Sequence, residues 1–301
     1  GGVGLDSKKK SEFKKIISKL SKLSASFEEN LLDSVNNYSL LIKDKNRLKG
    51  IPKDVLVKAK IDAKLQKKAG WSFSLNFPCY MPVMQYADDR ELRKQIYYAY
   101  ATKASDLSDK NEDNTDNINK ILLNKQKLAN LLGFSDYASM ALTTKMANSS
   151  KEVISFLDDL ANKAKPFASK DMADLINYGH KLNINDIEAW DVAYLSEKIK
   201  EERFNYSEQE IKSYFPDHKV IDGLFKVVEN IYGIFINKEI AEVWHKDVKF
   251  YKITNKSGGL IGYFYLDLYA RKSKRGGAWM DEAISKFKFN NEAAHPVAYL
   301  T

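Results

Sequence analysis

The sequence predicts a mainly α-helical protein with a small antiparallel β-sheet late in the chain. Apolar residues recur at helical spacing through most of the 301 residues, and the pattern changes to strand-like alternation beyond Gly233. Apolar residues make up 44% of the chain, which is enough to bury a substantial core in one large domain or two smaller ones. We expect a division into residues 1–87, a region of long helix and strand, and residues 88–301.

The first elements follow from periodicity and from the positions of proline and glycine. Residues 6–34 carry apolar side chains at intervals of three and four, which predicts a long helix. A second helix is expected from Pro52 to Gly70, because proline is favoured in the first turn of a helix and glycine after the last. The strict alternation of residues 71–77 predicts a half-buried strand that Pro78 stops.

Later helices are predicted from residues that cap the free N–H groups of a first turn. The expected helices run from Asp89 through Ala104, from Asn114 or Asp116 to Gly133, from Ser149 with Glu152, from Ser207 with Glu210, and over residues 221–232 before Gly233. Pro166 is expected to kink or end the helix that begins at Ser149.

The late sheet is predicted from alternation around a glycine-containing turn. Residues 248–254 and 260–270 are expected to form an antiparallel hairpin joined by NKSGG, with further strands near residues 276–280 and at residues 296–300. Within the second strand, one alternating set of side chains belongs to the core, and the other faces a cleft or a covering helix. The two sets are Tyr263, Tyr265 and Asp267 on one side and Phe264, Leu266 and Leu268 on the other, and the sequence leaves their assignment open.

The net charge of +8 makes nucleic-acid binding one alternative. The lysines, however, occupy polar helix positions that are typical of a solvated surface, and no motif that reads RNA or DNA accompanies them. We therefore expect no nucleic-acid partner. No apolar run has the roughly 18 residues that span a bilayer, and the first residues lack the apolar core of a signal peptide. These features and the single Cys79 favour a cytoplasmic protein without a membrane partner.

No local catalytic motif is present in the sequence. Two histidines four residues apart on a helix are the simplest way to present two metal-binding nitrogens. His180, His218, His245 and His295 are far apart, and none stands in an HExxH pattern. Cys79 has no histidine near it in the sequence, and neither a G-x-S-x-G elbow nor a phosphate-binding glycine loop occurs. From these patterns we assign no catalytic residue and no metal ligand to this chain.

A series of ordered sequence blocks resembles the oligopeptidase A and thimet oligopeptidase family of zinc metallopeptidases. The most specific blocks are FYLDLYAR, KRGGAWMD and PVAYLT, all of which lie beyond Tyr263. Further blocks are FEENLLDS (27–34), LLGFSDYASMALTTKMA (131–147), WDVAYLSEKIK (190–200), SYFP (213–216), VIDGLF (220–225) and VWHKDVKFY (243–251). The blocks keep the order of the family over nearly the whole chain.

The resemblance implies part of an elongated, mainly helical peptidase whose deep, narrow channel admits short unstructured peptides. In that family an HExxH helix and a later Glu bind zinc, and these elements follow the PVAYLT block. The resemblance therefore implies an internal portion of a longer zinc oligopeptidase that contributes cleft sheet and helical walls without the zinc site. The expected cofactor of the whole protein is zinc, and the expected partners are short peptides and the downstream zinc-binding part. This chain alone is expected to be inactive.

The resemblance also assigns a substrate-binding role to the KRGGAW segment. Gly276, Gly277 and Ala278 are expected to pair with substrate backbone, Trp279 to buttress that strand, and Arg275 to attract substrate carboxylates. From the residues alone, a tight loop and a core tryptophan explain the same segment. A non-catalytic peptide-binding module is the first alternative function, and a basic helical nucleic-acid-binding protein is the second.

Overall fold

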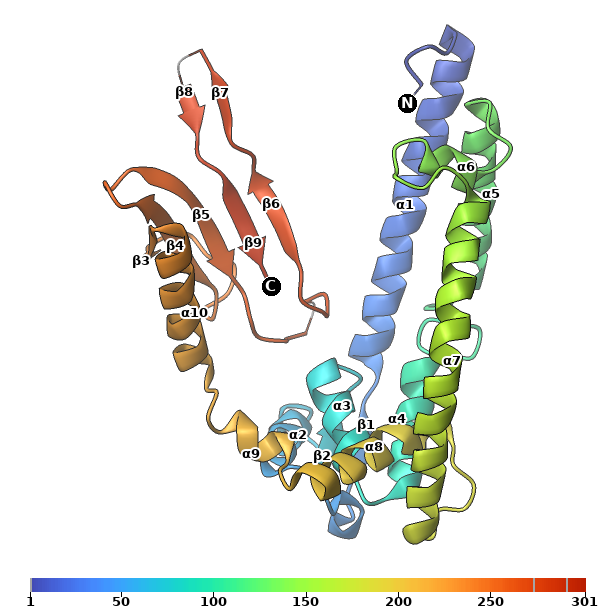
Figure 1. Ribbon diagram of the computed structural model, residues 1–301, viewed down its shortest axis with the longest axis vertical. Coiled ribbons are helices and arrows are strands. Elements are labelled where there is room, and N and C mark those ends of the chain that lie inside the picture. Colours follow the sequence, from blue (N-terminus) through green and yellow to red (C-terminus); the bar gives the residue numbers. More distant parts are fainter. Residues whose placement is uncertain (1, 273, 291) are drawn as a thin grey trace. The chain divides into compact units, whose positions relative to one another are not determined.

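The computed structural model describes residues 2–272, 274–290 and 292–301, and its chain divides into two compact units (Figure 1). The units are Gly1–Arg203 and Phe204–Thr301. The division expected after residue 87 stays a prediction. None of the helices in the described ranges combines the length and the apolarity that a membrane span requires.

The first unit consists mainly of helices. They are α1 (Ser7–Asn37), α2 (Lys53–Leu65), α3 (Phe77–Tyr86), α4 (Arg90–Ala101), α5 (Thr115–Leu131), α6 (Tyr137–Leu142), α7 (Ser150–Lys181) and α8 (Ala189–Phe204), with a short 3-10 helix at Lys45–Leu48. Strands β1 (Leu40–Ile42) and β2 (Trp71–Phe73) pair antiparallel in a small ladder.

The predicted caps open the helices where expected. Asp6 accepts a hydrogen bond from the N–H of Lys9 at 2.8 Å and begins α1. Asp89 and Ser149 begin α4 and α7 in the same way. Asn114 begins α5 with a different contact, because its side chain donates to the carbonyl of Phe27 in α1 at 3.1 Å. The start of α5 is therefore tied to α1.

Three expectations about proline and glycine are corrected. Helix α2 ends at Leu65 rather than Gly70, because Lys67 adopts a left-handed conformation with φ of 57°. Pro78 lies in the first turn of α3, which does not need the N–H that proline lacks, and the strand before it ends earlier, at Phe73. Helix α7 continues through Pro166 to Lys181, so the expected end there is wrong, while the alternative of a kink stays a prediction.

The core of the first unit lies where α2, α3 and α4 meet the β1–β2 ladder. Phe73 on β2, Val83 on α3, and Leu92 and Ile96 on α4 are completely buried there. Cys79 is partly buried among them, and burial raises the pKa of its thiol. Cys79 is therefore a packing residue, as its apolar surroundings in the sequence indicate.

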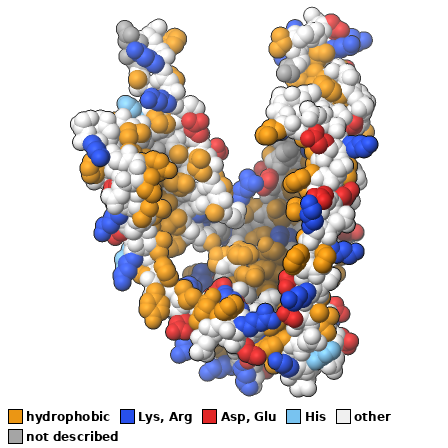
Figure 2. Space-filling model, viewed as in Figure 1, with side chains coloured by type: hydrophobic (Ala, Val, Ile, Leu, Met, Phe, Trp, Pro, Cys, Tyr) orange, Lys and Arg blue, Asp and Glu red, His pale blue; other side chains and the backbone are white. Residues whose placement is uncertain are grey.

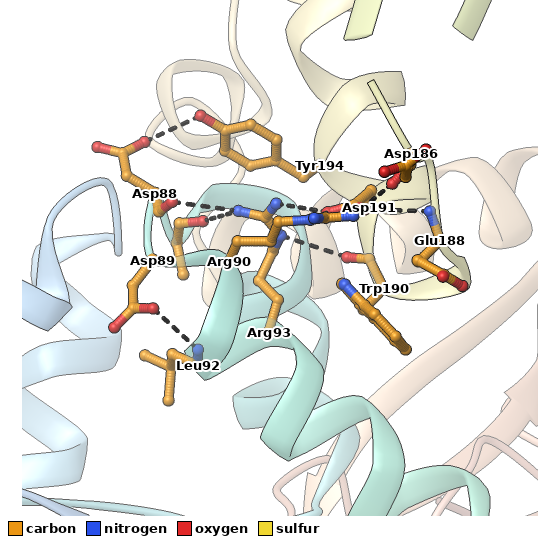
Figure 3. Close-up of polar contacts among 11 residues, drawn as sticks. Asp88, Asp89, Arg90, Leu92, Arg93, Asp186, Glu188, Trp190, Asp191 and Tyr194 are labelled. Atoms are coloured by element: carbon orange, nitrogen blue, oxygen red, sulfur yellow. Dashed lines mark hydrogen bonds and ion pairs between the residues drawn. The ribbon is translucent and has the colours of Figure 1, made fainter. Parts of the chain in front are cut away.

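A buried ion-pair cluster joins α4 to α8 (Figure 3). Asp191 is fully buried and accepts hydrogen bonds from Arg93 at 2.8 Å and from Arg90 at 2.7 and 3.0 Å. Arg93, also buried, donates to the carbonyl of Ala87 at 2.7 Å. Burial alone would raise the pKa of Asp191, but the hydrogen bonds from Arg90 and Arg93 outweigh it and lower that pKa. The buried charge of Asp191 is thus compensated inside the unit.

Tyr194 extends this cluster to the acidic pair before α4 (Figure 3). The guanidinium of Arg93 lies 4.1 Å from the centre of the Tyr194 ring. The hydroxyl of Tyr194 donates to Asp88 at 3.1 Å, and burial together with that carboxylate raises the pKa of Tyr194 to about 12. Asp88 and Asp89 therefore act as hydrogen-bonding and capping residues.

The second unit is a five-stranded sheet with helices before it. Its elements are α9 (Glu208–Lys212), α10 (Asp217–Tyr232), β3 (Ile234–Glu239), β4 (Lys249–Asn255), β5 (Leu260–Leu266), β6 (Met280–Ile284), β7 (Phe287–Phe289), β8 (Glu292–Ala294) and β9 (Val297–Leu300). Strands β3, β4, β5, β9 and β6 lie side by side in that order, and β7 pairs with β8. Gly233, with φ of 64°, ends α10 as predicted.

The sheet confirms the predicted β4–β5 hairpin and the last strand, and it corrects the third. That strand is β6, which begins at Met280, where the predicted strand near residues 276–280 ends. β6 pairs antiparallel with β9, whereas β5 and β9 run parallel. A parallel pair needs a long connection, and the connection here contains β6.

Helix α10 packs on one face of the sheet and settles which strand residues form the core (Figure 1). Phe264 and Leu266 are buried with Ile221 of α10 and with Tyr251 of β4. The alternate residues lie on the opposite face, where the ring of Tyr265 is 5.0 Å from that of Trp244 and 4.6 Å from that of Phe250. The Phe264 and Leu266 set is therefore the core set under α10.

We predict that Asp191→Asn lowers the free energy of unfolding of the first unit by about 3–5 kcal/mol, because it leaves Arg90 and Arg93 without a buried counter-charge. Urea unfolding followed by circular dichroism measures this change. Asp116→Asn is the matched control, since Asp116 pairs with Lys120 at 3.3 Å on the exposed surface of α5. Its change should stay within about 0.5 kcal/mol. Equal effects of the two substitutions would show that the Asp191 cluster contributes no more than a surface pair.

Candidate functional site

The segment between β5 and β6, residues 267–279, carries the five substrate-binding residues predicted from the sequence. It begins at Asp267, whose side chain is almost fully buried and whose N–H donates to the carbonyl of Leu300 in β9 at 2.8 Å. The segment therefore starts from a fixed point at the end of two neighbouring strands.

The carboxylate of Asp267 binds two cationic side chains of the same segment. Arg271 donates from both terminal nitrogens, each at 2.7 Å from one carboxylate oxygen. The Nζ of Lys274 lies 3.2 Å from Oδ1 and donates to the backbone carbonyls of Asp267 and Tyr269 at 2.7 and 3.1 Å. The indole N–H of Trp244, which precedes β4, donates to Oδ2 at 3.1 Å. These bonds bring Arg271, Lys274 and Trp244 together around one carboxylate.

The bidentate pair with Arg271 holds the pKa of Asp267 well below its usual range, against the opposing effect of burial. Trp244 and Lys274 lower the pKa of Asp267 further. Asp267 therefore stays ionised at neutral pH. Arg271 is engaged in this internal ion pair.

A second contact attaches the segment to α10. The hydroxyl of Tyr269 donates to the carboxylate of Asp217 in the first turn of that helix. Tyr269 is one of the residues whose carbonyl accepts from Lys274, so this contact and the Asp267 cluster share a residue. The beginning of the segment is thus tied to the sheet and to the helix on its face.

The predicted residues Arg275, Gly276, Gly277 and Ala278 are all exposed. A Cβ added to Gly276 or Gly277 would meet no atom within 4 Å, so no packing inside the unit requires these glycines. Gly277 has φ of 99°, which favours glycine for conformational reasons. Among the described residues, the backbone groups of residues 276–278 make no hydrogen bond. Residues 276–278 therefore form no backbone ladder with the other described residues, and no atom lies where a Cβ of Gly276 or Gly277 would be.

Trp279 marks the point where this segment joins the sheet. Its N–H donates to the carbonyl of Thr301 at 3.0 Å, and its carbonyl accepts from the N–H of Thr301 at 2.9 Å. The side chain of Trp279 is 38% exposed, so the alternative of a core tryptophan does not hold.

The pairing of Trp279 determines which backbone groups face the outer edge of the sheet. Trans peptide groups are planar, so the carbonyl of Ala278 points opposite to the N–H of Trp279, and the N–H of Met280 points opposite to the carbonyl of Trp279. β6 is the last strand on this side of the sheet among the described residues. One acceptor, on Ala278, and one donor, on Met280, therefore lie on an open edge.

Sequence reasoning missed Met280 and the central role of Asp267. The Met280 N–H could be recognised only once the pairing of Trp279 was known. For Asp267, the signal was present in the spacing of Arg271 and Lys274 after it, but the strand pattern placed Asp267 in an alternating set of side chains. At the end of a strand, no local sequence rule distinguishes a buried, ion-paired aspartate from an exposed one.

The residues described here do not fit a zinc ion. No group of three or more His, Cys, Asp or Glu side chains suited to a metal occurs in residues 2–272, 274–290 and 292–301. Asp267 is committed to Arg271 and Lys274, and His245 hydrogen-bonds locally with the N–H of Asp247 at 3.3 Å. No chemical step through a metal follows from these residues.

Residues 83–301 match the model of peptidase family M3. The chain belongs to this family. Over its full length it is 39% identical to oligopeptidase A of Escherichia coli, of which it covers 45%. It is 35% identical to a probable cytosolic oligopeptidase A of Arabidopsis thaliana, with 95% of the chain and 42% of that protein aligned. Saccharolysin of Saccharomyces cerevisiae is 29% identical over 99% of the chain and 43% of its own length.

These comparisons confirm the resemblance that the sequence blocks indicated. The matched region of family M3 includes the Asp267 cluster and the open edge at Ala278 and Met280. The chain spans less than half the length of these relatives.

We predict that Asp267→Asn lowers the free energy of unfolding of the second unit by about 2–3 kcal/mol at pH 7, because Arg271 and Lys274 lose their common counter-charge. Chemical unfolding, followed through the tryptophan fluorescence of this unit, measures the change. Asp222→Asn, on the exposed surface of α10, is the control and should change the free energy by less than about 0.5 kcal/mol.

The same pair of proteins gives a pH test. The pKa of Asp267 is lowered on folding, so its contribution is complete above the unfolded pKa of about 3.9 and is lost as the pH falls through the folded value. The stability difference between the native protein and Asp267→Asn should therefore shrink as the pH is lowered below about 4. A difference that stays constant down to pH 2 would contradict this assignment.

Proposed function

We propose that the protein containing this chain is a cytoplasmic zinc oligopeptidase, and that this chain contributes the strand edge that holds the peptide substrate. In this proposal, short unstructured peptides pair in extended form with the outer edge beside β6. The zinc ion and its ligands belong to the remaining part of the polypeptide. Membership of family M3 supports the peptidase activity, since relatives over the full chain are named oligopeptidase A.

The observation that carries the proposal is the open edge at residues 278–280. Backbone hydrogen bonds to an edge strand bind peptides of many sequences alike, because every residue offers the same N–H and C=O groups. The acceptor of Ala278 and the donor of Met280 are spaced to serve one residue of an extended peptide. Gly276 and Gly277 leave room beside them for a second backbone.

The Asp267 cluster supports a positioning role. Substrate backbone is held productively only if the edge is itself fixed, because a small displacement at the reacting bond costs much of the rate. Arg271 and Lys274 anchor the chain immediately before Arg275, and the paired Trp279 anchors it after Ala278. The exposed glycines thus lie between two fixed points.

Met280→Pro tests the role of the edge donor. The N–H of Met280 points away from β9, so proline removes it without removing a ladder hydrogen bond. In the complete enzyme we expect kcat/KM for an unstructured fluorogenic peptide to fall about 5- to 10-fold beyond the effect of Met280→Ala, the value of one hydrogen bond.

Met280→Ala removes the same side chain and keeps the N–H, so it measures the contribution of the side chain. If the two variants have equal kcat/KM while circular dichroism shows both folded, the Met280 donor does not bind substrate. Ala278→Pro is a second control, because it places a proline beside the edge but retains both the Ala278 carbonyl and the Met280 N–H, so it should leave most of the binding intact.

The open edge also supports a second function, a peptide-binding module without catalysis, since edge pairing requires no metal. We predict that the chain alone binds an unstructured peptide saturably but does not hydrolyse it, with or without added zinc. Calorimetry measures the binding, and mass spectrometry of the peptide measures cleavage. An absence of saturable heat would exclude the module. Cleavage by the isolated chain would contradict the division of roles between the two parts of the enzyme.

A further inference from the structure

The second unit contains a large apolar groove that the candidate edge does not use. The groove has a volume of about 1200 Å³ and lies between α10 and the face of β5, β9 and β6. Figure 2 shows hydrophobic side chains gathered over this helix and the adjoining sheet. Only Lys212, Asp217 and Glu282 among its lining residues carry a charge. The buried cluster beneath α10 is small by comparison, with Ile221, Tyr251, Phe264 and Leu266 at its centre.

Helix α10 carries two apolar stripes, and only one of them is covered. Ile221, Phe225 and Val228 face the sheet. A second stripe lies about 100° further around the helix, at the intervals four, three and four that suit packing against another helix. Its members are Val220, Leu224, Val227 and Ile231, which are 46%, 55%, 55% and 68% exposed. Val220 and Leu224 line the groove.

The width of the sheet also indicates that one face is only partly covered. Neighbouring strands are about 4.8 Å apart, so five strands span roughly 20 Å, whereas one helix is about 10 Å wide. One helix therefore covers about half of one sheet face. The uncovered half includes Leu300 of β9 and its partner Met280 of β6, which are 38% and 67% exposed. A second helix beside α10 would complete the layer.

We propose that an amphipathic helix from the rest of the family M3 polypeptide packs in this groove, beside α10 and against β9 and β6. The inference rests on the same family membership as the proposed function. It names a helix that would pack on the α10 face of the edge strand β6. Relatives that share this region have more than twice the aligned length, so a large part of the polypeptide is available to supply the helix.

Two other occupants fit the groove less well. A substrate peptide is held through free backbone groups, but β9 forms hydrogen bonds to β5 on one side and to β6 on the other, so the floor of the groove offers none. A second copy of this chain would have to use a surface that the relatives carry within a longer polypeptide. The helical spacing of the exposed stripe on α10 favours a helix as the neighbour.

Thiol accessibility tests the proposal in the complete polypeptide and in this chain alone. Leu224→Cys places a thiol in the groove, and Val220→Cys is a second variant at the same wall. Ile240→Cys is the control, because Ile240 is 96% exposed and does not line the groove. The rate of alkylation at each site is measured by mass spectrometry, which separates these thiols from Cys79.

In this chain alone, the thiols at positions 220 and 224 should react nearly as fast as the thiol at 240. In the complete polypeptide, both should slow at least about 30-fold, while the rate at 240 stays within about twofold. Equal rates in the two proteins would overturn the inference. Slowing that appears in this chain alone and grows with its concentration would assign the groove to a second copy. Slowing that requires added peptide would assign the groove to substrate.

Peptidase activity, measured on the same complete polypeptide, separates this inference from the proposed function. An active enzyme whose thiols at 220 and 224 react fast contradicts the packed helix and leaves the activity established. A protein with protected thiols and no cleavage of any unstructured peptide contradicts the proposed function and leaves the packing intact.

Discussion

The candidate site depends on one buried carboxylate, Asp267. An ionised side chain at that depth is costly unless cations and hydrogen-bond donors surround it. The chain supplies them from the residues that follow, Arg271 and Lys274, and from Trp244 before the neighbouring strand. Satisfying the charge therefore bends the connection after β5 into a defined path. The exposed glycines owe their position to this compensation, since nothing packs against them.

The first unit also contains a buried aspartate that is paired with cationic side chains, but in a different geometry. Asp191 is buried on α8 and is neutralised by Arg90 and Arg93, one turn apart on α4. Elements distant in sequence are thus held by a contact that tolerates little change of register, because each charge must meet its partner. In both units an aspartate provides the centre and arginine the planar, bidentate donor.

Local rules predicted the features that depend on neighbouring residues. The caps at Asp6, Asp89 and Ser149 and the glycine stop at Gly233 follow from the first or last turn of each helix, so periodicity and capping residues were sufficient. Pro78 was misassigned because an alternating stretch before it resembled a strand, whereas proline is equally suited to open a helix.

Features that depend on distant residues could not be derived in this way. Arg93 reads as an exposed helix residue, and only its partner 98 positions later makes it a buried one. The third strand was placed too early because its register is set by β9, which follows it in the chain. The family was recognisable without these contacts, because the evidence for it is the order of many sequence blocks along the chain. The backbone groups at the open edge required the pairing of Trp279 with Thr301.

The parallel pairing of β5 with β9 also sets an order of assembly. Strands β6 and β9 are close in sequence and can form their ladder early, as hairpins do. Their attachment to β5 has to wait until the whole stretch from Asp267 to Pro296 has closed as a loop, which carries an entropic cost and slows folding. The edge strand β6 therefore joins the sheet only through β9, when β9 pairs with β5. During synthesis, β6 reaches its final position only after the ribosome has added β9, which follows it in the chain.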